Sequence, residues 1–176
     1  MHSENTPMNK FTTACVIRRS KVLIVFTAAL FGLVTLVNNV TDYAAYADYI
    51  GRIISMSNTE GNDSRRYRAI HSTMFHHRFY WAIISLETIY TLSCLVGAYL
   101  LYRKVDAPRK EFHNAKKFAI AGLATGIIVY QILYVIILNE WFDMEYSAQR
   151  NANDWAQRNI EYMFLGLIYL TAAKDD

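Results

Sequence analysis

The chain has little cysteine and little proline, with two residues of each among 176. Cys15 lies near the N-terminus and Cys94 lies inside a long apolar run, so we expect no disulfide on an outer face of the protein. The paired thiols that a membrane thiol oxidase needs are also missing. Pro7 and Pro108 both fall outside the apolar runs, so proline should kink none of the helices that these runs form.

The sequence also lacks a recognisable enzyme motif or cofactor fingerprint. No two histidines have the His-x-x-x-His spacing that places two metal ligands on one face of a helix. No histidine lies inside a long apolar run, which argues against a haem held between membrane helices. The cofactor and the metal therefore stay unassigned, and the missing catalytic motifs favour a role other than that of an enzyme.

The sequence contains several long apolar runs. Three of them are long enough to cross about 30 Å of hydrocarbon as helices: residues 22–40, 79–101 and 118–138. A fourth reaches spanning length only when it is taken as residues 155–173, which places Arg158 and Glu161 close to one membrane interface. The sequence therefore predicts an all-α protein, a bundle of four transmembrane helices.

Lysine and arginine gather in the segments that would lie on one side of this bundle. Eleven of the 18 fall in the N-terminal segment, in the loop between the second and third runs, or near the C-terminus. Because these residues favour the cytoplasmic side of a membrane, we predict that both termini are cytoplasmic. Residues 1–20 would form a cytoplasmic tail, residues 21–176 a single membrane domain, and residues 42–78 an outer cap. The net charge of +3 then needs no nucleic-acid partner.

The predicted cap has the pattern of a helix that lies along the membrane surface. Its apolar side chains recur at helical spacing: Tyr43, Tyr46, Ile50, Ile53 and Ile54. A turn is expected over residues 57–64, and a second helix is expected from Arg65 towards the next apolar run.

Glu87 is the only formal charge in the run of residues 79–101. A carboxyl group at membrane depth is costly, so it should face the interior of a bundle or a cavity, where it either has a partner or is protonated. On a helix it shares a face with four other side chains: Tyr80, Thr91, Cys94 and Ala98. The opposite face would suit lipid: Ile89, Leu92 and Val96.

Other strongly polar side chains fall, like Glu87, in the predicted outer half of the membrane. Together they define a candidate polar pocket that is open to the outside: Asn38, Asn39, Asp42, Glu87, Gln131 and Glu161. The alternative is that these groups form hydrogen bonds between helices, as polar side chains do in many membrane bundles.

Charged and aromatic residues also flank the second and third runs at the predicted outer boundary. They form a candidate rim for a ligand or a partner: Arg68, His71, His76, His77, Glu140 and Trp141. Histidines with carboxylates can bind a metal ion, but interfacial anchoring or ordinary hydrogen bonding explains the same residues. Trp81 and Trp155 fall at this boundary too, where tryptophan belts form.

Gly122 and Gly126 form a G-x-x-x-G pattern in the third run. Small residues at this spacing let two helices approach closely, either within one chain or between two copies of it. The sequence leaves both arrangements open.

Short strings near the ends of the predicted spans resemble those of a known bacterial family. They are Asn38-Asn39-Val40-Thr41-Asp42-Tyr43, Ser55-Met56, Arg68-Ala69-Ile70, His76-His77, Tyr80-Trp81, Glu87, Ala115-Lys116 and Glu140-Trp141-Phe142-Asp143-Met144. In these strings, and over nearly the whole chain from about Lys21, the sequence is similar to predicted small integral membrane proteins of unknown function. The resemblance implies a four-span protein of the bacterial inner membrane and supplies no activity.

Two classes of function are compatible with these features. Small size, missing catalytic motifs and the glycine pattern favour a non-catalytic accessory or structural subunit of a membrane protein complex. The outer polar groups favour a small proton-linked carrier, or a ligand- or metal-binding membrane protein whose pocket surrounds Glu87. The expected partners are the lipid bilayer and either a larger membrane complex or a second copy of the chain.

Overall fold

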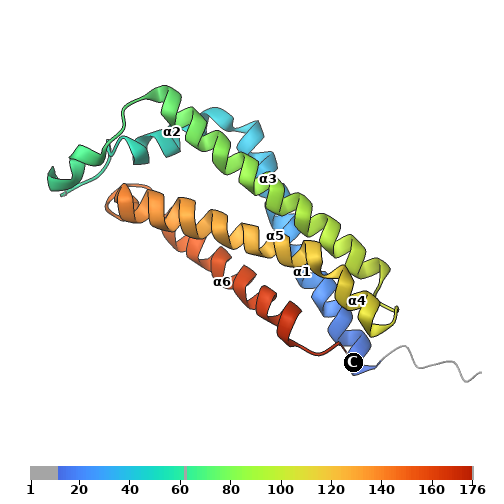
Figure 1. Ribbon diagram of the computed structural model, residues 1–176. Coiled ribbons are helices and arrows are strands. Elements are labelled where there is room, and N and C mark those ends of the chain that lie inside the picture. Colours follow the sequence, from blue (N-terminus) through green and yellow to red (C-terminus); the bar gives the residue numbers. More distant parts are fainter. Residues whose placement is uncertain (1–11, 62, 176) are drawn as a thin grey trace, which may run out of the picture.

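The computed structural model describes residues 12–61 and 63–175, so residues 1–11 of the predicted tail lie outside the described part. The described residues form helices and no strand (Figure 1). The elements are α1 (Thr13–Thr41), α2 (Tyr43–Ile54), η1 (Asp63–Arg68), α3 (Thr73–Arg103), α4 (Arg109–Ala115), α5 (Lys117–Ile128), η2 (Val129–Trp141), η3 (Met144–Tyr146) and α6 (Asn151–Ala172). Within this part, three segments are long and apolar enough to cross a membrane: Thr13–Thr41, Thr73–Arg103 and Arg109–Trp141. The predicted all-helical class is confirmed, and a fourth crossing by α6 stays a prediction.

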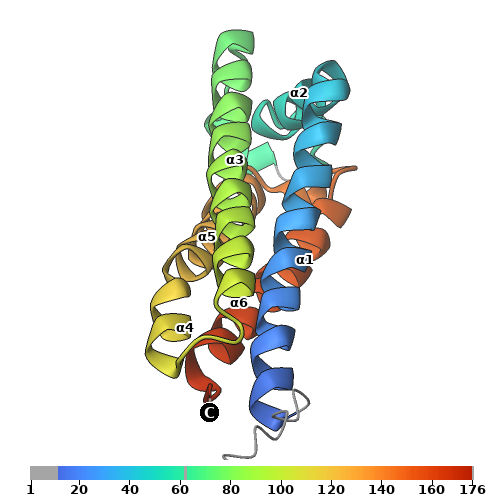
Figure 2. The ribbon, with the colours of Figure 1, turned by 90° about the vertical axis from the view of Figure 1, so that its right-hand side faces the viewer.

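The long helices lie side by side (Figures 1 and 2). α1 packs against α3, α3 packs against α5, and α6 packs against α5, η2 and α1. The first and the last described residues lie at the same end of the molecule, which we call the terminal end (Figure 2). α2 lies at the opposite end, which we call the cap end.

The face of α3 that carries Glu87 is the face that is buried. Its members have relative exposures of 4% or less: Tyr80, Glu87, Thr91, Cys94 and Ala98. The opposite face is exposed, as the helical periodicity predicts: Ile89, Leu92 and Val96. An exposed aliphatic face of this kind suits contact with lipid tails, which are as apolar as leucine.

The two glycines of the G-x-x-x-G pattern in α5 lie at contacts with other helices of the same chain. A Cβ atom on Gly122 would lie 2.6 Å from Sγ of Cys94 in α3, and one on Gly126 would lie 2.5 Å from Sδ of Met163 in α6. Both distances are too short for a real contact. At Gly122 the backbone nitrogen of Cys94 would also lie only 2.8 Å away, so glycine is needed for this approach of α5 to α3, whereas at Gly126 the flexible side chain of Met163 would have to move. Of the two arrangements that the sequence left open, the structure shows the one within a single chain.

Two helices begin earlier than the sequence predicts. α1 begins at Thr13, inside the segment predicted as a tail, and the hydroxyl of Thr12 accepts a backbone N–H there at 3.2 Å. α3 begins at Thr73, inside the segment predicted as a cap, and the hydroxyl of Ser72 accepts a backbone N–H at 3.4 Å. In both cases a capping hydroxyl starts the helix ahead of the apolar run.

The third long segment changes its winding halfway along. The sequence predicts one α-helix over residues 118–138, but α5 continues into η2, which is a π-helix. In a π-helix each N–H bonds to the carbonyl five residues back, so one turn holds more residues than in an α-helix. Tyr130, Tyr134 and Leu138 are all buried, and at their spacing of four they lie near one face of the helix.

At the terminal end, a carboxylate near the end of the chain joins two lysines. Asp175 accepts a hydrogen bond from Nζ of Lys21 in α1 at 2.6 Å and from Nζ of Lys116, between α4 and α5, at 2.5 Å. All three side chains are buried, and we call them the terminal clamp. Burial alone would raise the pKa of Asp175, but the hydrogen bonds and charges of the two lysines hold it below its ordinary value.

Replacing Asp175 with Asn should loosen the C-terminal end of α6. The change leaves two buried ammonium groups without a carboxylate, which should cost about 2 kcal/mol, as for a lost hydrogen bond to a charged group. Amide hydrogen exchange in the last turn of α6 should become faster, whereas Lys174→Gln at the exposed neighbouring position should leave it unchanged.

The same contact should depend on pH in a defined direction. Folding lowers the pKa of Asp175. The contribution of Asp175 to the free energy of unfolding is therefore complete above the unfolded-state pKa of about 3.9, and it is lost as the pH falls through the lower, folded-state pKa. Asp175→Asn should lack this acid-sensitive part of the stability. Equal exchange in Asp175→Asn and in the unaltered protein at neutral pH would contradict the clamp.

Candidate functional site

Glu87 is completely buried in α3 and has one hydrogen-bond partner, an amide. Nδ2 of Asn39, near the end of α1, donates to Oε2 of Glu87 at 2.6 Å. The hydroxyl of Tyr80 donates to the backbone carbonyl of Asn39 at 3.3 Å, so α3 holds the asparagine at two points. Among the described residues, Glu87 forms no ion pair with a lysine, arginine or histidine. The partner of this carboxyl group is therefore a neutral amide.

Two buried oxygens beside this pair have no hydrogen-bond partner among the described residues. They are Oε1 of Glu87 and Oγ1 of Thr91, one turn further along α3. Gly32 of α1 lies directly against the hydroxyls of Thr91 and Tyr90, because a Cβ at that position would be 2.2 Å from Oγ1 of Thr91 and 2.5 Å from Oη of Tyr90. Since buried polar atoms are nearly always hydrogen-bonded, these two oxygens mark a polar point within the apolar packing of α1 and α3.

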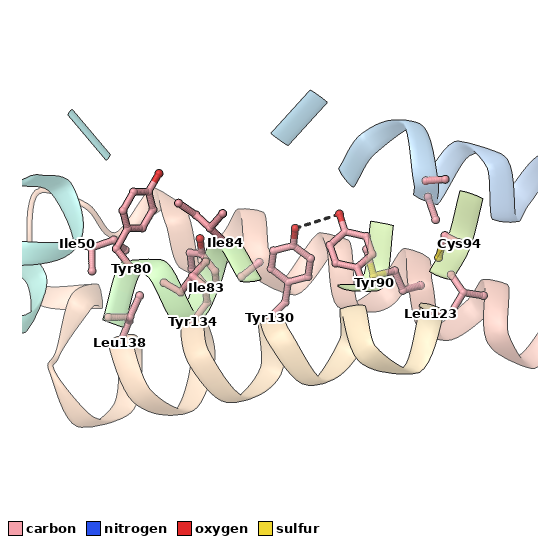
Figure 3. Close-up of a cluster of buried hydrophobic side chains, with 14 of the residues drawn as sticks. Ile50, Tyr80, Ile83, Ile84, Tyr90, Cys94, Leu123, Tyr130, Tyr134 and Leu138 are labelled. Carbon is pink, nitrogen blue, oxygen red and sulfur yellow. Dashed lines mark hydrogen bonds between the residues drawn. The ribbon is translucent and has the colours of Figure 1, made fainter. Parts of the chain in front are cut away.

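Aromatic rings from α1, α3, η2 and α6 pack together next to Glu87. The hydroxyl oxygens of Tyr90 and Tyr130 lie 3.5 Å apart (Figure 3). The ring of Tyr130 is perpendicular to that of Trp155, with 5.2 Å between centroids, and Tyr134 lies 5.7 Å from the same indole. Phe31 reaches Trp155 from α1 at 5.9 Å. Perpendicular and tilted ring pairs at these distances are favourable, so the cluster ties the four segments together.

A cavity of about 430 Å³ opens beside these rings, towards the cap end. Its aromatic lining consists of Phe31, Tyr46, Tyr49, Tyr80, Tyr134 and Trp155. Its polar lining consists of Thr35, Asn38, Asn39 and Asn151. We call this space the aromatic cavity. Asn39 belongs both to its wall and to the hydrogen bond with Glu87, so the buried carboxyl group lies directly behind the wall.

α2 forms part of the wall of the aromatic cavity at the cap end, through Tyr46, Tyr49 and Ile50. The hydroxyl of Tyr49 donates to the backbone carbonyl of Gln149 at 3.2 Å, which joins α2 to the segment before α6. Burial raises the pKa of Tyr49 to about 12, so its hydroxyl keeps its proton at neutral pH and remains a donor. An ion pair of 2.7 Å between Arg65 and Asp143 makes a second connection between the cap and the segment after η2.

The structure brings together only part of the predicted polar pocket. Three of its residues lie at the aromatic cavity or directly behind its wall: Asn38, Asn39 and Glu87. The other three are exposed elsewhere on the surface: Asp42, Gln131 and Glu161. Gln131 follows Tyr130 in η2, and because the tyrosines occupy the inward face of that helix, the glutamine lies on the outer one. The six residues therefore do not form one pocket.

The predicted rim is divided among separate contacts. Nδ1 of His77 lies 2.9 Å from a tyrosine hydroxyl of α2, and Nε2 of His76 lies 2.6 Å from a backbone carbonyl of the loop before α3. The guanidinium of Arg68 lies over the ring of Trp141, 4.6 Å from its centroid. The remaining two members are exposed: His71 and Glu140. Within the described residues, no group of three His, Cys, Asp or Glu side chains could hold a metal ion.

Sequence reasoning missed the aromatic half of the site. Trp155, which the sequence places in an outer belt, instead packs against Tyr130 and Tyr134 and lines the cavity. Two signals were available in the sequence. The four-residue spacing of the two tyrosines marks a shared helix face, and the small pair Ala28 and Gly32 marks a close approach in α1.

In the described part of the chain, the all-helical architecture and three helical segments long enough to cross a bilayer define the class of an integral membrane protein. The model of the family described as predicted small integral membrane protein (DUF2165) matches residues 17–173, and the chain belongs to this family. This match confirms the family that the sequence resembles. No curated protein and no solved structure matches the chain.

Replacing Glu87 with Gln should preserve the fold, whereas Glu87→Ala should weaken it. Glutamine keeps an oxygen that accepts the hydrogen bond from Asn39, so the free energy of unfolding should change by less than about 1 kcal/mol. Alanine leaves the buried amide of Asn39 unpaired, which should cost about 1–3 kcal/mol. The matched control is Glu161→Ala, at an exposed glutamate, with an expected change below about 0.5 kcal/mol.

These free energies can be measured by denaturant unfolding in mixed lipid and detergent micelles. If Glu87→Ala and Glu161→Ala unfold with the same free energy, the hydrogen bond between Asn39 and Glu87 contributes nothing to the fold.

Proposed function

We propose that the chain is a four-span protein of the bacterial inner membrane that binds a small amphipathic molecule in the aromatic cavity and catalyses no reaction. One observation carries this proposal: a cavity of about 430 Å³ whose wall residue Asn39 is hydrogen-bonded at 2.6 Å to the buried Glu87. A volume of this size lies within the range of about 300–1,000 Å³ that small-molecule sites have.

The arrangement of α6 supports a fourth crossing. This helix has 22 residues, and at about 1.5 Å per residue it is long enough for about 30 Å of hydrocarbon. Three of its large apolar side chains are exposed, as they would be against lipid: Phe164, Leu165 and Ile168. The lysines and arginines near the terminal end support the predicted cytoplasmic position of both termini.

The chemistry of the lining indicates the kind of molecule. Six aromatic rings provide flat apolar surfaces, which favour a ligand with a ring of its own. The amides of Asn38, Asn39 and Asn151 can each donate and accept hydrogen bonds, so the ligand should also carry a polar group. Glu87 supports the site indirectly, because it fixes the side chain of Asn39 and so the direction in which that amide faces the cavity.

The glycine pattern no longer favours the hypothesis of an accessory subunit. Gly122 and Gly126, which could have packed against another chain, contact Cys94 and Met163 of the same chain. Small size and missing motifs remain compatible with that role, but neither distinguishes it from ligand binding. The structure favours the binding protein, and the experiment below separates the two hypotheses.

Filling the aromatic cavity should displace its ligand. Ala152 lines the cavity, so Ala152→Trp should place an indole inside it, whereas Ala172→Trp adds the same side chain at an exposed position of the same helix. Both proteins would be purified in a mild detergent, and the small molecules extracted from them would be identified and quantified by mass spectrometry. A ring-containing compound should accompany the unaltered chain and Ala172→Trp, and should fall at least about tenfold in Ala152→Trp, which corresponds to a loss of about 1.4 kcal/mol of binding.

Two results would overturn the proposal. One is equal retention of the compound by both tryptophan variants. The other is the absence of any small molecule from the unaltered chain together with stoichiometric recovery of another membrane protein, which is the result that an accessory subunit would give.

A further inference from the structure

A second hollow lies at the terminal end, between α1 and the end of α3. Its volume is about 690 Å³. Arg19 reaches it from α1, Arg103 from the last turn of α3, and Asp106 from the loop that follows. Its apolar lining includes Val22, Leu23, Phe26 and Tyr102. We call this hollow the arginine groove.

The loop that carries Asp106 is held in place by the neighbouring arginine of α1. Arg18 donates to the backbone carbonyls of Val105 at 3.1 Å and Ala107 at 2.6 Å, one on each side of Asp106. Successive residues of an α-helix point about 100° apart, so Arg18 binds the loop while Arg19 lines the groove. Arg18 therefore holds the loop at one side of the groove, while Arg19 and Asp106 line the groove and take no part in that contact.

The charged groups of the groove are available to a ligand. Arg19 and Asp106 are exposed, and neither forms a hydrogen bond or an ion pair with any other described residue. Arg103 uses one nitrogen to donate to the hydroxyl of Tyr99 at 2.9 Å, and a guanidinium has five N–H groups in total. Two positive groups and one negative group therefore face the same space.

The apolar side of the groove continues from Arg19 towards the middle of the membrane. Leu23 and Phe26 follow on the same face of α1, and they are 63% and 46% exposed. At 1.5 Å per residue, Phe26 lies about 10 Å deeper than Arg19. Since the apolar run of α1 begins just after Arg19, the charged groups lie at the level of lipid headgroups and the apolar side chains lie at the level of acyl chains.

We propose that the arginine groove binds a membrane phospholipid whose headgroup carries a primary amine, of the phosphatidylethanolamine type. The phosphate lies between the guanidinium groups of Arg19 and Arg103, and guanidinium groups form strong, directional hydrogen bonds with phosphate oxygens. The ammonium group is paired with the carboxylate of Asp106. One acyl chain lies along Leu23 and Phe26.

The acidic residue selects this headgroup among membrane lipids. A phosphatidylglycerol headgroup has the phosphate but no ammonium group, so it leaves Asp106 unpaired beside a negative charge. A phosphatidylcholine headgroup has a positive charge but no N–H to donate, and its methyl groups hold that charge away from the carboxylate. The set of two arginines and one aspartate therefore complements one phosphate and one primary ammonium.

Native mass spectrometry of the purified, delipidated full-length chain can test the assignment. The chain would be titrated with phosphatidylethanolamine, phosphatidylglycerol and phosphatidylcholine that carry the same acyl chains. The unaltered chain should bind phosphatidylethanolamine about tenfold more tightly than either of the others, a ratio typical of one charge-assisted hydrogen bond. Arg19→Gln should weaken the binding of all three lipids about tenfold, because all three carry the phosphate.

Two further variants make the test specific to the groove. Asp106→Asn should leave binding of phosphatidylcholine unchanged and remove the preference for phosphatidylethanolamine. Lys110→Gln removes one positive charge at an exposed position of α4 that does not line the groove, so it should change nothing. Arg19 and Asp106 are exposed and make no described contact, so both variants should fold, and their thermal unfolding would be compared with that of the unaltered chain.

The proposal is overturned if the unaltered chain binds the three lipids equally or prefers phosphatidylglycerol. It is also overturned if Lys110→Gln weakens binding as much as Arg19→Gln, because the attraction is then general and not a property of the groove. Retention of the phosphatidylethanolamine preference by Asp106→Asn would overturn the assignment of the headgroup.

Discussion

A carboxyl group at membrane depth has no water to satisfy it, and this constraint organises the core of the protein. The hydrogen bond of 2.6 Å from Asn39 to Glu87 meets it by joining α1 to α3. Gly32 allows the two helices to approach closely enough for this contact, and Tyr80 holds the backbone of Asn39 from the same side. The strength of such a bond is greater where little water competes for it, so one contact can set the register of two helices.

The aromatic cavity follows from the same arrangement. With α1 bound to α3 through Asn39, the space between α1 and α6 is bridged at its core by ring contacts such as that of Phe31 with Trp155. Tyr130 and Tyr134, four residues apart on the buried face of η2, both pack against Trp155. α2 forms part of the cavity wall at the cap end through Tyr49. The cavity is thus a feature of the packing of several elements, with Asn39 as the residue that links its wall to the buried carboxyl group.

The sequence is sufficient to predict the parts that depend on periodicity within one helix. The prediction that the face of α3 around Glu87 is buried is correct, because a carboxyl group that is costly in lipid indicates which side of the helix faces inward. Gln131 was assigned to the pocket by its depth in the membrane, and depth does not say which face of a helix is buried. Tyr130 and Tyr134 occupy the inward face of η2, so Gln131 lies on the outer one. The terminal clamp was not predictable either. Lys21 and Asp175 form an ion pair although they lie near opposite ends of the sequence. A local sequence pattern cannot predict a contact between residues so far apart.

The most direct test of this account is a double-mutant cycle between Asn39 and Glu87. Free energies of unfolding would be measured for the unaltered chain, Asn39→Ala, Glu87→Ala and the double variant in the same lipid and detergent mixture. If the hydrogen bond joins α1 to α3 as described, the two changes should be strongly non-additive, with a coupling energy of about 1.5–3 kcal/mol. Additive changes, with a coupling energy near zero, would contradict the account.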